Sequence, residues 1–147
     1  MREFFRQLLF RPEIEKSRLI RFTENCGYMY ILIGSLFLFV PNSLVMLGLT
    51  PTFQGQEEGL IRIVGITVAI IGYFYIFGAR THSRAFGLST ILDRLLIPFL
   101  LSFVYLVSNV ELFLLLPLGV LDPVLALIAL YLWKNYPEDF VGESDNG

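Results

Sequence analysis

Four long apolar runs constrain the fold of this 147-residue chain more than any other feature. They cover residues 26–40, 60–78, 91–107 and 112–133. Most of them approach or exceed the roughly 18 to 20 residues that a membrane-spanning helix needs. Because the runs contain almost no Lys, Glu or Gln, they lack the polar stripe that helices of a soluble bundle turn toward water. The sequence therefore predicts an all-α integral membrane protein, built as a four-helix bundle.

The composition excludes several kinds of site and partner. Hydrophobic residues make up 55% of the chain, well above the usual soluble mixture. A single cysteine, Cys26, and a single histidine, His82, provide neither an internal disulfide nor a Cys/His metal cluster. The net charge of −2 gives no sign of a nucleic-acid partner, and no nucleotide-binding glycine motif or Ser–His–Asp set occurs. We therefore expect no resident metal or cofactor, and no catalysis by this chain alone.

The positive charges indicate which helix ends face the cytoplasm. The basic residues before the first run, around the second connection and after the fourth run are Arg2, Arg6, Arg11, Lys16, Arg18, Arg21, Arg80, Arg84, Arg94 and Lys134. The other two connections, 49–59 and 108–111, contain no Lys or Arg. By the positive-inside rule, both termini and the loop 79–90 are cytoplasmic.

The chain divides into three predicted segments. Residues 1–22 form a cytoplasmic amphipathic segment, which lies in the lipid headgroup region or docks on a partner protein. Residues 23–134 form the four-helix transmembrane domain, and residues 135–147 form a flexible cytoplasmic tail. After the first run, the Pro-Asn-Ser sequence at 41–43 predicts a short interfacial helix. A single kinked helix that continues to Leu49 is the alternative.

Asp122 lies near the middle of the fourth run, where a carboxylate is most costly in a bilayer. Placing such a group at mid-membrane costs roughly 2.5 to 3.5 kcal/mol, so it usually faces a protein interior and has a partner. Small residues let helices pack closely in lipid. The small-residue stripe of this run consists of Gly119, Asp122, Ala126 and Ala129. We therefore expect Asp122 on the packing face of its helix.

Three interpretations of Asp122 stay open. Pro117 and Gly119 before it and Pro123 after it can mark a broken helix whose second half Asp122 caps, or Asp122 can form a structural pair. It can bind a ligand, such as a quinone-type headgroup. It can also take part in proton or ion translocation, since transport sites often combine a broken helix with polar groups.

A polar line on the third helix is predicted to face Asp122. Its members, three or four residues apart, are Arg94, Pro98, Ser102, Tyr105 and Asn109. In a spanning helix such a line faces a neighbouring helix or a hydrated cavity. With a rise of about 1.5 Å per residue, Ser102 and Tyr105 reach the depth of Asp122, and Arg94 reaches it by extending outward. We interpret Thr90 and Asp93 as the capped start of this helix.

At the outer boundary, Arg62 and Glu111 are predicted to form an ion pair. The pair would join the second helix to the turn between the third and fourth helices. Arg62 can instead meet a lipid phosphate or an acidic partner. The packing stripe of the second helix consists of Arg62, Gly65, Ala69 and Gly72.

The tyrosine and tryptophan residues are interpreted as an interfacial belt. Those near the cytoplasmic ends of the runs are Tyr28, Tyr30, Tyr73, Tyr75, Tyr131, Trp133 and Tyr136. Such residues are enriched where a membrane meets water. A ligand pocket can use the same residues, but the belt needs no ligand.

Several short strings at corresponding places resemble small bacterial four-helix membrane proteins of the DoxX-like and BphX-like families. They are Phe39-Val40-Pro41, the Leu-Gly-Leu segment at 47–49, Leu60-Ile61-Arg62, Asp93-Arg94 and Leu121-Asp122. The resemblance covers most of residues 20–135. It implies a place in the bacterial inner membrane and, as for some DoxX-like proteins, a role in a quinone-linked oxidoreductase. It carries over no catalytic motif, because no diagnostic string occurs.

Three functions follow from these observations. The first is a small non-catalytic subunit or assembly factor, which binds membrane lipids and either other membrane subunits or a second copy of itself. The second is an intramembrane binder or transporter of a small lipid-like or quinone-like molecule, with a pocket around Asp122. The third, which the resemblance alone implies, is a component of a quinone-linked oxidoreductase. The second function requires a pocket at Asp122.

Overall fold

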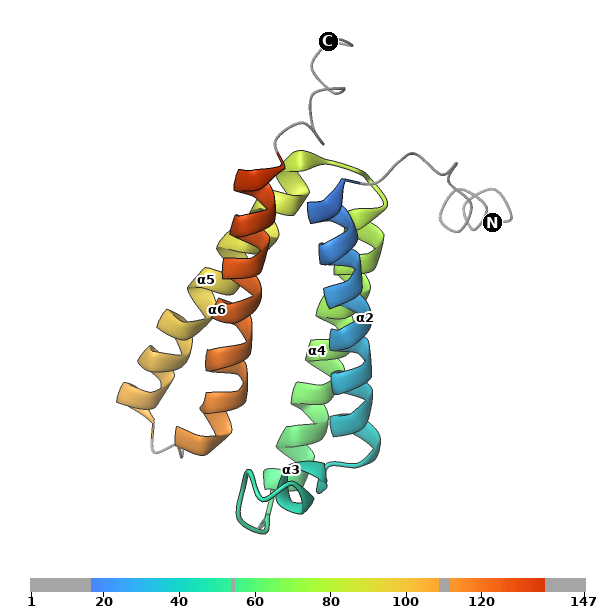
Figure 1. The fold of residues 1–147 in the computed structure, drawn as a ribbon. Helices are drawn as coiled ribbons and strands as arrows, with labels where there is room; N and C mark the ends of the chain where they lie inside the picture. The colour runs from blue at the N-terminus through green and yellow to red at the C-terminus, as the bar shows by residue number, and fades with distance from the viewer. Residues whose placement is uncertain (1–16, 54, 109–111, 137–147) are drawn as a thin grey trace, which may run out of the picture.

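The computed structural model describes residues 17–53, 55–108 and 112–136 (Figure 1). Within these ranges the chain is all-α, with no strand. The helices are α2 (Arg18–Phe39), α3 (Ser43–Met46), α4 (Glu57–Ala79), α5 (Arg84–Val107) and α6 (Leu112–Asn135). Helix α4 and the segment Ala85–Val107 of α5 are each long and apolar enough to cross a membrane. The predicted amphipathic segment before residue 17 and the predicted tail after residue 136 lie outside the described residues.

The four long helices form two hairpins, α2 with α4 and α5 with α6. They run alternately up and down, so that α2 begins and α6 ends at the same end of the molecule (Figure 1). Contacts between the hairpins are far fewer than contacts within them, and the ribbons separate toward the end that carries α3. Each hairpin is therefore a tightly packed unit, and the two hairpins contact each other less extensively.

Close packing of α2 against α4 depends on glycines that face each other. A Cβ added to Gly72 of α4 would lie 2.6 Å from the carbonyl oxygen of Gly27 on α2. One added to Gly65 of α4 would lie 2.7 Å from the carbonyl oxygen of Gly34. These approaches are closer than any side chain allows, so the predicted small-residue stripe of α4 does form its packing face. The matching stripe on α2, Gly27 and Gly34, was not singled out in the sequence.

The connection after α2 agrees with the prediction of a short separate helix. Helix α2 ends at Phe39, and α3 follows within a few residues, with Ser43 and Leu44 buried. Gly48 then adopts a φ of 69°, which glycine tolerates without strain. The single kinked helix to Leu49 is not formed.

The predicted start of α5 is wrong, and one of the open interpretations of Asp122 is excluded. Helix α5 begins before Thr90 and Asp93, because Ser83 caps it by accepting a hydrogen bond from the backbone N–H of Phe86. Thr90 lies inside the helix and donates to the carbonyl oxygen of Gly87, 2.8 Å away. Helix α6 is continuous from Leu112 to Asn135, so Asp122 does not cap a half-helix.

Candidate functional site

Asp122 is buried on the packing face of α6, together with Ala126 and Ala129. Its carboxylate accepts a hydrogen bond from the phenol of Tyr30 on α2. The two residues belong to different hairpins, and only 7% of Asp122 and 4% of Tyr30 are exposed. Asp122 thus has a structural partner, which agrees with one of its open interpretations, but the partner comes from the first helix and not from the third. Figure 1 shows the two helices that this bond joins, α2 and α6.

A second tyrosine–aspartate pair lies beside the first. Tyr75 of α4 donates to the carboxylate of Asp93 on α5 over 2.7 Å. The rings of Tyr30 and Tyr75 meet edge to face, with their centroids 5.5 Å apart. Asp93, unlike Asp122, is exposed. All four long helices therefore contribute one residue to this polar cluster, which we call the Tyr–Asp cluster: Tyr30, Tyr75, Asp93 and Asp122.

Arg94 is the largest of the fully buried side chains in the described ranges, with 1% of its surface exposed. Its guanidinium carbon lies 5.0 Å from the ring centroid of Tyr75 and 5.7 Å from that of Phe22. Its positive charge acts on Asp122, Tyr30 and Cys26. None of its three nitrogens has a hydrogen-bond partner among the described residues. Arg94 therefore balances the charge of Asp122 through space and through aromatic contacts, without a direct ion pair.

A cavity of about 240 Å³ lies between the two hairpins and borders the Tyr–Asp cluster. All four members of the cluster line it, and Arg94 does not. The rest of the wall is almost entirely apolar and comes from α4 and α5: Ile63, Val64, Thr67, Val68, Ile71, Ile97 and Leu101. Small-molecule sites commonly combine an apolar wall with a few convergent polar groups, and this cavity has that composition. No three His, Cys, Asp or Glu side chains in the described ranges lie close enough together to hold a metal ion.

The polar line predicted on the third long helix, α5, does not gather around Asp122 as a whole. Ser102 donates to the carbonyl oxygen of Pro98 in its own helix, 2.7 Å away, and Tyr105 is exposed. Both line a separate hollow between α5 and α6, of about 300 Å³, which Asp122 does not line. The predicted contact of Ser102 and Tyr105 with Asp122 is thus not formed. Asn109 lies outside the described residues.

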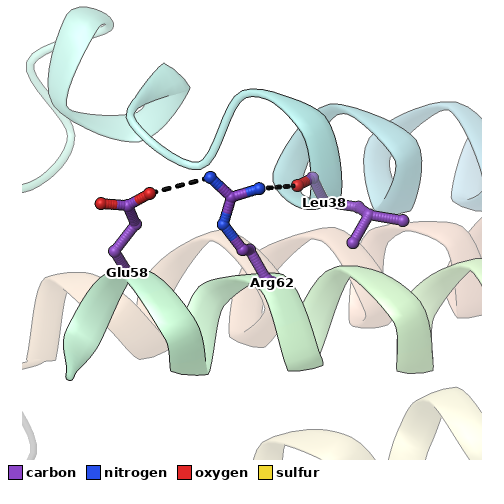
Figure 2. A network of polar contacts seen from close by, with 3 residues as sticks. All are labelled: Leu38, Glu58 and Arg62. Atoms are coloured by element: carbon purple, nitrogen blue, oxygen red, sulfur yellow. Dashed lines mark hydrogen bonds and ion pairs between the residues drawn. The ribbon is translucent and has the colours of Figure 1, made fainter.

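Arg62 holds together the end of the first hairpin that carries α3 (Figure 1, Figure 2). One of its nitrogens lies 2.8 Å from the carboxylate of Glu58 in the same helix, and another donates over 2.7 Å to the carbonyl oxygen of Leu38. Leu38 is in the last turn of α2, where carbonyl groups lack helical partners, so Arg62 caps that end. Its predicted partner, Glu111, lies outside the described residues.

The sequence predicts that Tyr30 and Tyr75 belong to the interfacial belt, and this prediction is wrong for both. They are buried, whereas Tyr28, Tyr73 and Tyr131 are exposed as a belt residue would be. The helical spacing of the sequence indicates which of these tyrosines are buried. Tyr30 lies three or four residues from Gly27 and Gly34, and Tyr75 lies three residues after Gly72, so each shares the packing face of its helix.

These observations define a helical protein with two candidate membrane-spanning helices and an amphipathic cavity between two hairpins. No protein-family model, curated protein or solved structure matches the chain. The resemblance to DoxX-like and BphX-like proteins therefore stays a prediction from short strings and topology.

Proposed function

We propose that this chain is an integral membrane protein that binds a small amphipathic molecule in the cavity between its two hairpins. The observation that carries the proposal is the cavity wall, in which the Tyr–Asp cluster borders an otherwise apolar surface. A ligand with one polar group and an apolar body would match both parts of this wall. The cavity also meets the requirement of the second function, namely a pocket at Asp122.

A four-span topology in a bacterial inner membrane, with both termini cytoplasmic, is part of the proposal. It is supported by the two candidate spans and by the large hydrophobic side chains exposed along the helices, which lipid would cover. The basic residues described near one end of the bundle, among them Arg18, Arg80 and Lys134, also favour it. The Tyr–Asp cluster would then lie at membrane depth, where a polar group usually serves a site or a partner.

Thermal unfolding in mild detergent tests the proposal with four compact aromatic probes. They are benzyltrimethylammonium, its uncharged isostere neopentylbenzene, the anion para-tert-butylbenzoate and the uncharged acceptor duroquinone. A ligand that binds the folded state raises the unfolding midpoint. We expect at least one probe to do so for the wild-type protein.

Two variants show whether such a shift comes from the cavity. Val64→Phe fills it, because Val64 lines the wall. Ile66→Phe adds a ring on the exposed side of the same helix and serves as the matched control. The shift should persist in Ile66→Phe and disappear in Val64→Phe. If no probe shifts the midpoint, or if the shift survives in Val64→Phe, the proposal fails.

The role of accessory subunit or assembly factor stays a prediction. Purification from native membrane in mild detergent examines it, because a partner subunit would come with the protein. The same preparation can be analysed by mass spectrometry for a bound small molecule, which we expect in the wild-type protein and not in Val64→Phe.

A further inference from the structure

The hydrogen bonds around the cavity define which groups its wall offers to a ligand. The hydroxyl groups that line it are those of Tyr30, Thr67 and Tyr75. Tyr30 and Tyr75 donate to the two aspartates of the lining, and Thr67 donates over 3.0 Å to the carbonyl oxygen of Ile63. A hydroxyl has a single proton to donate. Each of these groups therefore has only lone pairs left for a ligand.

The remaining polar groups of the wall are also acceptors. In their ionised form, Asp93 and Asp122 accept hydrogen bonds and donate none. The unused donors nearby belong to Arg94, which does not line the cavity. A ligand that only accepts hydrogen bonds, such as a quinone, would place its oxygens against oxygens. A ligand that donates hydrogen bonds or carries positive charge would be complementary to this wall.

The balance of charge around the cavity further narrows the class of ligand that would fit it. Among the residues that the structure describes, the charges that act on the buried members of the Tyr–Asp cluster are those of Asp93, Asp122 and Arg94. Two carboxylates and one guanidinium leave a single negative charge without a counterion. In an environment of low dielectric constant an uncompensated charge is costly, so a bound positive charge would be favoured.

We propose that the ligand of this cavity is a monovalent organic cation with a compact apolar body. Its positive group would lie between the carboxylates, Asp122 deep in the wall and Asp93 at the exposed rim. Its apolar body would contact the aliphatic side chains of α4 and α5. A volume of about 240 Å³ limits the body to a single ring or a short alkyl group. This inference rests on the proposed function and specifies its ligand class.

Titration of the purified protein with the four probes tests the charge requirement. Benzyltrimethylammonium and neopentylbenzene have the same shape and differ in the positive charge, so their comparison isolates that charge. We expect the cation to bind at least about tenfold more tightly than its isostere, the effect of one charge-assisted contact. The anion should bind least, because it adds to the negative charge of the wall.

Three variants locate the charge that the cation meets. Asp122→Asn and Asp93→Asn should each weaken binding of benzyltrimethylammonium by about tenfold and leave neopentylbenzene unchanged. Glu58→Gln removes the same charge outside the cavity, at the outer end of α4, and should leave both affinities unchanged. Asp93→Asn keeps the test decisive if Asp122→Asn fails to fold, because Asp93 is exposed.

The failure of this inference can be told apart from the failure of the proposed function. If neopentylbenzene, duroquinone or the anion binds in the cavity as tightly as the cation, the proposed function stands and the cation class is wrong. The inference that the ligand is a cation would also be wrong if the cation bound equally tightly to the wild-type protein and to Asp93→Asn. If no probe binds, the proposed function fails as well.

Discussion

The phenol of Tyr30 on α2 donates a hydrogen bond to the carboxylate of Asp122 on α6 and so joins the two hairpins. Contacts between the hairpins are sparse, so each polar link between them, this bond and the Tyr75–Asp93 bond, carries more weight than it would in a uniformly packed bundle. The bond also connects the more buried aspartate of the cavity wall, Asp122, with the more buried of its two tyrosines, Tyr30.

Tyr30→Phe should lower the free energy of unfolding by about 2 kcal/mol, because it leaves the buried carboxylate of Asp122 without its donor. Tyr75→Phe removes the equivalent bond to Asp93 and should cost about 1 kcal/mol or less, since Asp93, unlike Asp122, is not buried. Unfolding in mixed detergent micelles measures the loss in both variants.

Asp122→Leu should likewise lower the midpoint of thermal unfolding more than Asp93→Leu. Equal losses within each pair would show that Asp122 has no special partner.

Arg94 and Asp122 should be energetically coupled although no direct ion pair joins them. Arg94→Met leaves the negative charge of Asp122 uncompensated, and Asp122→Asn leaves buried Arg94 without its counter-charge. The double variant contains neither charge, so it should be more stable than the sum of the single losses predicts, by about 1 to 3 kcal/mol.

A matched cycle with Glu58→Gln provides the control for this coupling. Glu58 lies in the first turn of α4, at the end of the bundle that carries α3, and pairs with Arg62, whereas Arg94 lies in the half of α5 nearer the other end (Figure 1). Arg94→Met and Glu58→Gln should therefore add to within about 0.5 kcal/mol. Additivity in both cycles would refute the coupling of Arg94 to Asp122.

Gly72→Ala should destabilise the first hairpin by about 1 to 3 kcal/mol, because the added methyl group meets the backbone of α2. Gly59→Ala makes the same chemical change in the same helix where nothing lies within 4 Å of the new Cβ. It should have no cost, and it should stabilise by up to about 1 kcal/mol through helix propensity. Thermal unfolding of both variants distinguishes packing from propensity, and a neutral Gly72→Ala would contradict the observed approach of α2 and α4.

Arg62→Met should cost about 1 kcal/mol, since it removes the donor to the carbonyl oxygen of Leu38 as well as the ion pair with Glu58. Glu58→Gln removes the ion pair alone and should cost less than about 0.5 kcal/mol, because both side chains are partly exposed. Comparison of the two unfolding midpoints shows whether the hydrogen bond to Leu38 or the ion pair with Glu58 contributes more to stability. If Glu58→Gln is the more costly change, the cap on α2 contributes little.

Cysteine labelling in intact cells tests the proposed topology. The variants Glu57→Cys and Ser83→Cys are made in a Cys26→Ser background, which removes the single native thiol. A membrane-impermeant maleimide should label position 57 from outside and should not label position 83. The reverse pattern would show that the basic residues lie outside and that the positive-inside assignment is wrong.

Apolar runs and charge placement allowed the helical class, the approximate helix positions and the burial of Asp122 to be predicted. These properties depend on local composition and on helical periodicity, which one chain displays directly. The glycine stripe of α4 was recognised for the same reason. The start of α5 was predicted wrongly, because the cap was predicted at Thr90, whereas the structure caps a longer helix at Ser83.

Only the tertiary structure decided which groups meet. The sequence placed Asp122 opposite the third helix because that helix is its neighbour along the chain, whereas the four-helix arrangement brings α2 to it and supplies Tyr30. Spacing along one helix identifies the face a residue occupies but not the helix that this face contacts. Asp122 was therefore recognisable as buried from the sequence, but its partner, its shared cavity with Asp93 and the proximity of Arg94 arise from packing between segments distant along the chain.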